Sequence, residues 1–260
     1  MVGFDLLLFI LALLSSVLNG LTSLGGGILF FYGLIFLYQN SMSIEGTMQQ
    51  LATIVMFYSL ASALTGTLVY YKNRLYDRLT NWYLGSGAFI GGLIGSLLAY
   101  SLSNAFLQIL FFLVTLLASI ASYIKPAPAG YEKSWSLKWY VLFGILIGGL
   151  GGIYGLGLGF LFLPVMILIY KIPIKQAVGS SLFCALLLVV GAMFGKIGTA
   201  FVEGAFVEGK IAFLATLGGV IGTLLGGWLG VRVRSNVIRI ITSMVLGITA
   251  IIFLIDALVK

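Results

Sequence analysis

Two glycine-rich stretches are the places where this sequence could hold a ligand with its backbone. Ser23-Leu24-Gly25-Gly26-Gly27 is followed 132 residues later by Gly155-Leu156-Gly157-Leu158-Gly159, and both stretches lie inside long apolar runs. Glycines in such runs serve either for close helix packing or for breaking a helix and freeing its backbone. Free N–H groups at the positive end of a half-helix attract anions. A break would therefore make Gly25, Gly26, Gly27, Gly155, Gly157 and Gly159 candidate anion-binding residues.

Polar residues at the start of the apolar run that follows each glycine stretch are further candidates. They are Gln49, Gln50 and Thr53 in the first half, and Gly179, Ser180 and Ser181 in the second. Amide and hydroxyl donors can bind a small oxyanion without the desolvation cost of a buried charge. The alternative is structural, because Ser and Thr often bond carbonyls of their own helix and Gln often joins helices.

Lys196 is the one charged residue well inside an apolar run. A basic residue at that depth usually faces a cavity or a partner, so it could balance the charge of an anionic substrate. It is also about seven residues from the next polar loop, close enough for its side chain to reach the interface. Both interpretations stay open.

The residues that the sequence lacks exclude several kinds of chemistry. Histidine is absent, so His-based acid/base steps and His-ligated metals are excluded. All seven carboxylates lie in predicted loops or near the ends of predicted spans, so a deep carboxylate proton carrier is not expected. We expect neither a catalytic centre, nor a cofactor, nor a metal site.

The composition is that of an integral membrane protein. Hydrophobic residues make up 61% of the 260 residues and charged residues 8%, and the mean hydropathy is +1.17. The net charge of +7 comes from short basic loops, which is the usual topology signal of membrane proteins and not a sign of nucleic-acid binding. The expected partners are the lipid bilayer and a small anionic substrate.

The chain divides into two similar halves. Eight apolar runs are found, at 4–38, 46–71, 79–100, 104–124, 139–170, 176–202, 211–231 and 237–259. A polar, proline-containing linker at 125–138 separates a first repeat, 1–124, from a second, 139–260. Besides the glycine stretches, Gly87, Gly91 and Gly95 match Gly218, Gly222 and Gly226 at a spacing of 131. These six glycines lie four apart, a spacing that predicts close helix packing, and the registered matches predict an internal duplication.

Basic residues then predict how the halves are oriented. If each glycine-interrupted run folds back as a helical hairpin, the loops divide thirteen of the basic residues eleven to two between the two sides. If every run crosses once, the division is eight to five. The positive-inside rule prefers the hairpins, and the two repeats are then inverted relative to each other. The predicted fold is an all-α polytopic membrane protein, each repeat being a Gly-broken hairpin plus three transmembrane helices. Whether the hairpins span or are re-entrant is left open.

Gly155-x-Gly157-x-Gly159 with Pro164, followed by Ala177-x-Gly179-Ser180-Ser181, resembles the repeated signature of the TauE/SafE sulfite exporter family. The resemblance extends over nearly the whole chain. It implies export of sulfite or of small organosulfonates across a prokaryotic plasma membrane. In the first half Ser23 takes the place of the leading glycine and Tyr32 that of the proline. The two halves of the site therefore differ in chemistry.

The predicted function is a secondary transporter, not an enzyme, that exports a small sulfur-containing oxyanion such as sulfite or sulfoacetate by alternating access. The N- and C-termini are expected outside and the linker in the cytoplasm. A transporter of another solute and a non-transporting membrane enzyme or assembly subunit are the alternatives. The glycine-lined helix faces could serve a homodimer as well as the internal fold.

Overall fold

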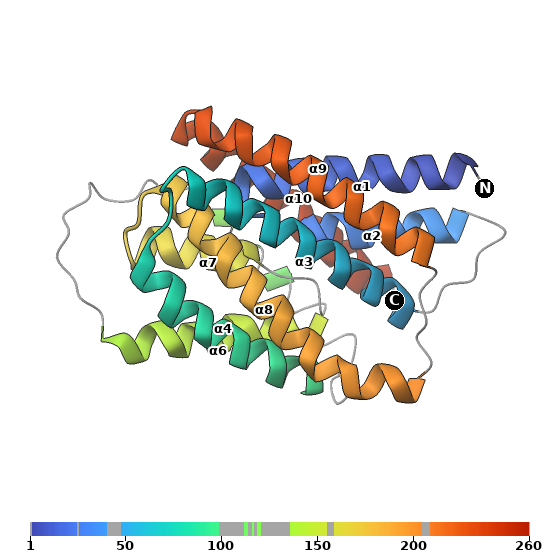
Figure 1. Ribbon diagram of the computed structural model, residues 1–260, viewed down its shortest axis with the longest axis horizontal. Helices are drawn as coiled ribbons and strands as arrows, with labels where there is room; N and C mark the ends of the chain where they lie inside the picture. The colour runs from blue at the N-terminus through green and yellow to red at the C-terminus, as the bar shows by residue number, and fades with distance from the viewer. Residues whose placement is uncertain are drawn as a thin grey trace.

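The computed structural model describes residues 2–24, 26–40, 48–98, 112–113, 116, 119–120, 136–154, 159–203 and 209–259. The regular secondary structure in these ranges is all helical, as predicted (Figure 1). The helices are α1 Val2–Thr22, α2 Gly26–Asn40, α3 Met48–Lys72, α4 Arg78–Leu98, α6 Leu137–Tyr154, α7 Phe162–Pro164, α8 Ile174–Glu203, α9 Gly209–Arg232 and α10 Ser235–Val259. Most of the predicted linker, 125–135, and most of the fourth apolar run lie outside the described residues.

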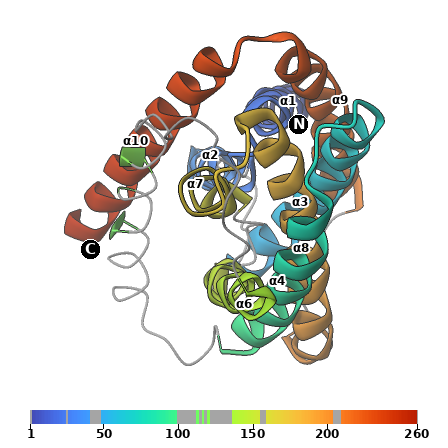
Figure 2. The same ribbon diagram turned by 90° about the vertical axis from the view of Figure 1, so that its left-hand side faces the viewer.

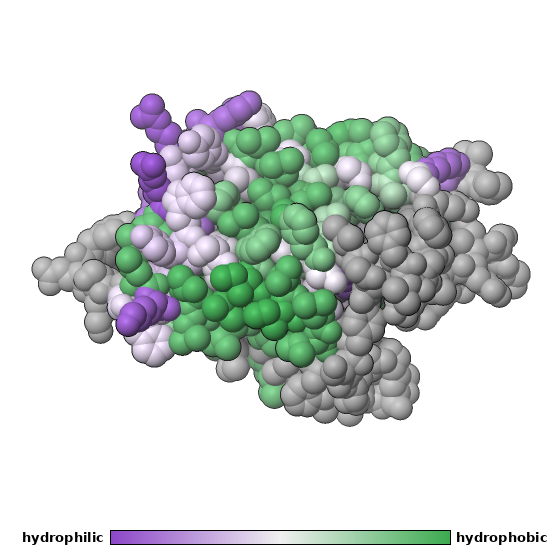
Figure 3. Space-filling view, turned by 60° about the horizontal axis from the view of Figure 1, so that its bottom comes forward, coloured by the Kyte–Doolittle hydropathy of each residue, from purple (hydrophilic) through white to green (hydrophobic). Residues whose placement is uncertain are grey.

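Several helices have the length and composition of membrane spans. Within the described part of the chain, four are long and apolar enough to cross a membrane: Gly3–Thr22, Leu51–Lys72, Ile174–Lys196 and Gly209–Arg232. A broad band of hydrophobic residues covers the middle of the visible surface, and hydrophilic residues gather toward its left-hand end (Figure 3). This surface fits a bilayer.

Both glycine-interrupted runs fold back on themselves, as the charge distribution predicted. The first run breaks between α1 and α2, and the rings of Phe4 and Tyr38 meet edge to face with centroids 5.4 Å apart. In the second run, Tyr140 near the start of α6 stacks on Tyr170 at 4.0 Å. Each pair joins the beginning of one arm to the end of the other. In each hairpin, therefore, the first arm starts and the second arm finishes at the same end of that hairpin.

The second hairpin has an irregular returning arm. It consists of a 3₁₀ turn at Gly159–Leu161, the short α7, and a π-helical turn at Val165–Ile169. Pro164 has no N–H to donate to the helix. The matching position in the first half is Tyr32, and there α2 is a regular helix of 15 residues.

Glycine faces bring helices of opposite halves into backbone contact, as the four-residue spacing predicted. A Cβ added to any of these glycines would run into the backbone of the facing helix. On α4, Gly87, Gly91 and Gly95 face the carbonyls of Val141, Ile145 and Gly149 in α6. On α9, Gly218, Gly222 and Gly226 face the carbonyls of Phe9, Leu13 and Val17 in α1. The structure therefore confirms the packing interpretation for these six positions.

Basic loops meet at one end of the bundle. The Lys175 ammonium donates to the carbonyl of Val231 at 2.7 Å, which joins the start of α8 to the end of α9. The backbone N–H of Asp77, in the loop after α3, donates to Ser180 at 2.8 Å. Exposed tryptophans lie within a turn of basic residues at this end, namely Trp82, Trp139 and Trp228. Trp135, which the same prediction included, lies outside the described residues.

The returning arms of the two hairpins lie in the middle of the molecule. Viewed along the bundle, α2 and α7 are enclosed between α1, α3, α8 and α6 on one side and α10 on the other (Figure 2). Helix α10 is tied to the fourth apolar run by a reciprocal pair of bonds between Ser119 and Ser243. The central position of the two arms is the feature that defines the candidate site.

Candidate substrate-binding site

The two glycine-rich stretches come together in space. A Cβ added to Gly159 would lie 2.9 Å from the Cβ of Ala185, 3.3 Å from the Oγ of Ser23 and 3.4 Å from the Ser23 carbonyl oxygen. The break in the first hairpin, the start of the second returning arm and the middle of α8 therefore form one contact. Gly25, Gly155 and Gly157 lie outside the described residues.

This contact lies in the middle part of α8. Ala185 is eleven residues after Ile174, where α8 begins. At 1.5 Å per residue, eleven residues correspond to about 16 Å, half the thickness of the hydrocarbon core. The hairpin breaks thus meet about half a hydrocarbon thickness from the start of α8.

Ser23 stands out at this contact. Its φ of 56° is in the left-handed region that favours glycine. The residue is fully buried, and its Oγ has no hydrogen-bond partner among the described residues. A buried hydroxyl without a partner costs about 1–3 kcal/mol, and strained backbone adds to that cost. Such a hydroxyl is suited to form a hydrogen bond with a ligand that enters the site.

The N-terminus of α2 lies beside Ser23. Gly26 and Gly27 are buried there, where the first N–H groups of a helix have no intrahelical acceptor. A Cβ on Gly26 would come within 2.5 Å of the Tyr58 hydroxyl oxygen and 2.9 Å of the Ser15 carbonyl oxygen. The lack of a side chain at Gly26 therefore lets α1, α2 and α3 approach one another closely.

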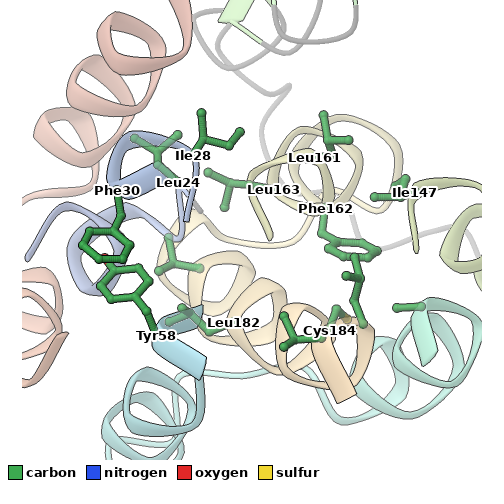
Figure 4. Close-up of a cluster of buried hydrophobic side chains, with 14 of the residues drawn as sticks. Leu24, Ile28, Phe30, Tyr58, Ile147, Leu161, Phe162, Leu163, Leu182 and Cys184 are labelled. Carbon is green, nitrogen blue, oxygen red and sulfur yellow. The ribbon is translucent and has the colours of Figure 1, made fainter. Parts of the chain in front are cut away.

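Apolar side chains surround the break on the side of the second hairpin. Leu163 points toward Leu24 and Ile28 (Figure 4), and each of the three is at most 3% exposed. On the other side the ring of Phe30 stacks on Tyr58, with centroids 4.3 Å apart. Water is excluded from these walls, which strengthens any electrostatic interaction formed between them.

A buried polar network supports the first hairpin, and sequence reasoning missed it. Asn19 donates to Ser62 at 2.7 Å, and Ser62 shares a hydrogen bond with Thr223. Close by, Ser15 and Tyr58 share a hydrogen bond of 2.8 Å. Isolated Ser, Thr, Asn and Tyr residues inside apolar runs were the available signal, but only the packing of α1, α3 and α9 shows which of them meet.

The corresponding positions in the second half are apolar. Adding 132 to 15, 19, 58 and 62 gives Ile147, Gly151, Val190 and Phe194. Subtracting 131 from 223 gives Gly92. The space beside Gly151 is occupied by the side chain of Leu188, whose Cδ1 would lie 2.5 Å from an added Cβ. Hydrogen bonds therefore support one hairpin, whereas apolar contacts support the other.

The predicted residues at the start of α8 have structural partners. Gly179 packs against the carbonyl of Leu75, and the Ser180 hydroxyl accepts the N–H of Asp77. Ser181 donates to Val178 in its own helix at 2.9 Å. Ser181 nevertheless lies one turn before Ala185 on the same helix face. Of these three residues it is the nearest along α8 to the hairpin contact.

The remaining predicted residues are spread along α3 and α8. Thr53 is half-buried in α3 at the position that matches Ala185. Gln49 and Gln50 are in the first turn of α3, but their side chains lie outside the described set. Lys196 is half-buried eleven residues beyond Ala185, about 16 Å further along the helix. The structure thus does not bring Lys196 to the hairpin contact.

The sequence model of the family described as Sulfite exporter TauE/SafE matches residues 8–253. The chain belongs to this family. Within it, the chain is 27% identical to the probable membrane transporter protein YunE of Bacillus subtilis, over 88% of both chains. It is also 23% identical to a probable membrane transporter protein of Methanocaldococcus jannaschii, over 95% of this chain and 94% of that protein. No solved structure matches it.

Membership of the TauE/SafE family confirms that the protein is a membrane transporter and not an enzyme. The match includes both hairpins and the helices that follow them, so the contact between Ser23 and Gly159 is inside the shared region.

Proposed function

We propose that this transporter exports a small sulfur-containing oxyanion, such as sulfite or a small organosulfonate like sulfoacetate, and binds it where the two hairpins meet. The observation that carries the proposal is the contact of Ser23 with Gly159 beside the middle part of α8. There the Ser23 hydroxyl, which has no hydrogen-bond partner among the described residues, lies beside the N-terminus of α2. The description of the family names sulfite as its substrate.

Neutral donors suit this substrate. The hydroxyl of Ser23 and the N–H groups at the start of α2 can each donate to an oxyanion, and the helix dipole favours its charge. Asp5 and Asp77 lie at opposite ends of the bundle, so these two carboxylates do not repel an anion at the hairpin contact. We propose that Gly26, Gly27 and Gly159 contribute backbone groups to the site, with Thr53 and Ser181 one on each side.

An inverted repeat is part of the same proposal. Exchanging the two halves converts one glycine interface into the other, because the packing of α4 against α6 corresponds to the packing of α9 against α1. The facing carbonyls correspond as well, since Val141, Ile145 and Gly149 follow Phe9, Leu13 and Val17 by 132 residues each. This agreement supports a two-fold relation between the repeats. Movement of one repeat against the other would expose the site to each side in turn.

The proposed orientation places the basic end of the bundle in the cytoplasm and both termini outside the plasma membrane. The positive-inside rule supports it. An anion leaving a cell with a negative interior then needs no coupled ion, because the membrane potential supplies about 2.3 kcal/mol per charge per 100 mV.

Flux measurements in liposomes test this function. Purified protein should carry radiolabelled sulfite or sulfoacetate at a rate that rises with an outwardly driving potential. Ser23→Gly removes the hydroxyl but tolerates the left-handed backbone, so it should fold and raise KM about tenfold. Ser86→Ala, on the exposed face of α4, is the matched control and should transport normally. Flux of only neutral or cationic solutes, or an unchanged KM in Ser23→Gly, would contradict the proposal.

A further inference from the structure

A groove of about 640 Å³ lies on the outside of the bundle, between the last turns of α3 and α9. Its apolar walls are Val69, Leu224, Leu225 and Val231. Leu224 and Leu225 are 47% and 49% exposed. In a membrane protein such exposed apolar walls face lipid chains, so the groove opens to the bilayer and not to the interior of the transporter.

The polar end of the groove is ordered by Arg232. Its guanidinium carbon lies 4.0 Å from the centre of the Trp228 ring, and its Nη1 donates to the Trp228 carbonyl at 3.1 Å. A guanidinium has five N–H donors, so this bond leaves others for a ligand. Asn73, which completes this end, donates its own amide to Val69 at 2.7 Å. Ring and bond together hold the guanidinium at the mouth of the groove.

The position of Arg232 corresponds to the level of lipid headgroups. It is the last residue of the span Gly209–Arg232, and exposed Trp228 is one turn before it, as in the aromatic belt of membrane proteins. Exposed Lys72 and Arg74 flank the groove in sequence. The local charge is therefore positive, which complements an anionic headgroup and disfavours a cationic one.

We propose that this groove binds one anionic phospholipid of the adjacent leaflet. Its phosphate would accept hydrogen bonds from Arg232, which can bind it with two parallel donors. An acyl chain would follow Leu224, Leu225 and Val69 toward the middle of the membrane. Because α3 supplies one wall and α9 the other, the bound lipid stabilises the packing of these two helices. The site is independent of the transported substrate.

Lipid titrations of the purified full-length protein test the proposal. Wild-type protein in mild detergent should gain thermal stability with added phosphatidylglycerol and gain less with phosphatidylcholine of the same acyl chains. Native mass spectrometry should show retained phosphatidylglycerol. Arg232→Gln should reduce that retention about fivefold, as expected for one basic contact at a membrane surface. Arg234→Gln, which removes a charge at the same end outside the groove, should behave like the wild type.

Three outcomes would overturn the proposal. Equal stabilisation by both lipids would show that the headgroup charge is not recognised. Equal loss in Arg232→Gln and Arg234→Gln would show only a general attraction to the basic surface. Stabilisation by soluble glycerol 3-phosphate alone would show a phosphate site without a lipid. If Arg232→Gln fails to fold, Trp228→Leu removes the ring that holds the guanidinium and should give the same loss of retention.

Discussion

The interface between α4 and α6 contains two glycines that should respond in opposite ways to alanine. A Cβ on Gly91 would lie 2.6 Å from the backbone nitrogen of Gly149 and even closer to the carbonyl oxygen of Ile145. A Cβ on Gly149 would have only the Gly91 carbonyl oxygen within reach, at an ordinary 3.9 Å. Gly91→Ala should therefore push the helices apart, whereas Gly149→Ala should fit.

The expected magnitudes follow from these distances. Overpacking a close contact costs about 1–3 kcal/mol, and the clash in Gly91→Ala is with backbone, which cannot rotate away. Both substitutions gain up to about 1 kcal/mol of helix propensity. Gly91→Ala should lose about 1–2 kcal/mol net, and Gly149→Ala should gain up to about 1 kcal/mol. At about 2–4 °C per kcal/mol, the resulting difference of about 1–3 kcal/mol should separate their Tm values by about 2–12 °C.

A thermal-shift assay in detergent measures this difference directly, with size-exclusion chromatography confirming that both variants are folded at the start. The shared interface and the identical chemical change make Gly149→Ala the matched control. Equal Tm values for the two variants, or a Gly149→Ala protein that is the less stable one, would refute the packing geometry that we describe for α4 and α6.

Two further predictions concern the polar network and the orientation. Thr223→Val keeps the shape of the side chain but leaves Ser62 without its bond to Thr223, so Tm should fall by about 2–8 °C, corresponding to about 1–2 kcal/mol; an unchanged Tm would show that the network adds no stability. Introduced cysteines should differ in labelling by a membrane-impermeant maleimide on intact cells, with Lys210→Cys labelled and Arg234→Cys protected. Labelling of Arg234→Cys alone would reverse the proposed orientation.

Much of the fold could be predicted because membrane physics leaves few choices. Apolar runs had to become helices, and the basic loops indicated the two fold-backs that the aromatic pairs Phe4–Tyr38 and Tyr140–Tyr170 confirm. The four-residue glycine spacing correctly predicted packing faces. It could not predict which helices those faces meet, because the sequence of a helix does not identify the helix against which it packs.

The site was harder to predict, since polar residues look alike before the helices are packed. Ser180 was predicted as an anion ligand from its position after the second hairpin, but its hydroxyl accepts the N–H of Asp77 in a loop about a hundred residues away. Ser23 was noted only as a departure from glycine. Its left-handed backbone, and the lack of a hydrogen-bond partner for its hydroxyl within the described part of the chain, become visible only when the surrounding atoms are placed.

The glycine interfaces also constrain how this protein can be made. Helix α1 finds its close-packed partner in α9, and α6 finds its partner in α4, so both interfaces join the first half of the chain to the second. Among the described helices, the glycine face of α9 packs on α1 and on none from its own half. During biosynthesis, α1 therefore lacks its close-packed partner until more than two hundred further residues have been inserted into the membrane. Neither half is expected to fold when expressed alone. The two halves therefore depend on each other for their closest helix contacts, much as the two subunits of an obligate dimer do.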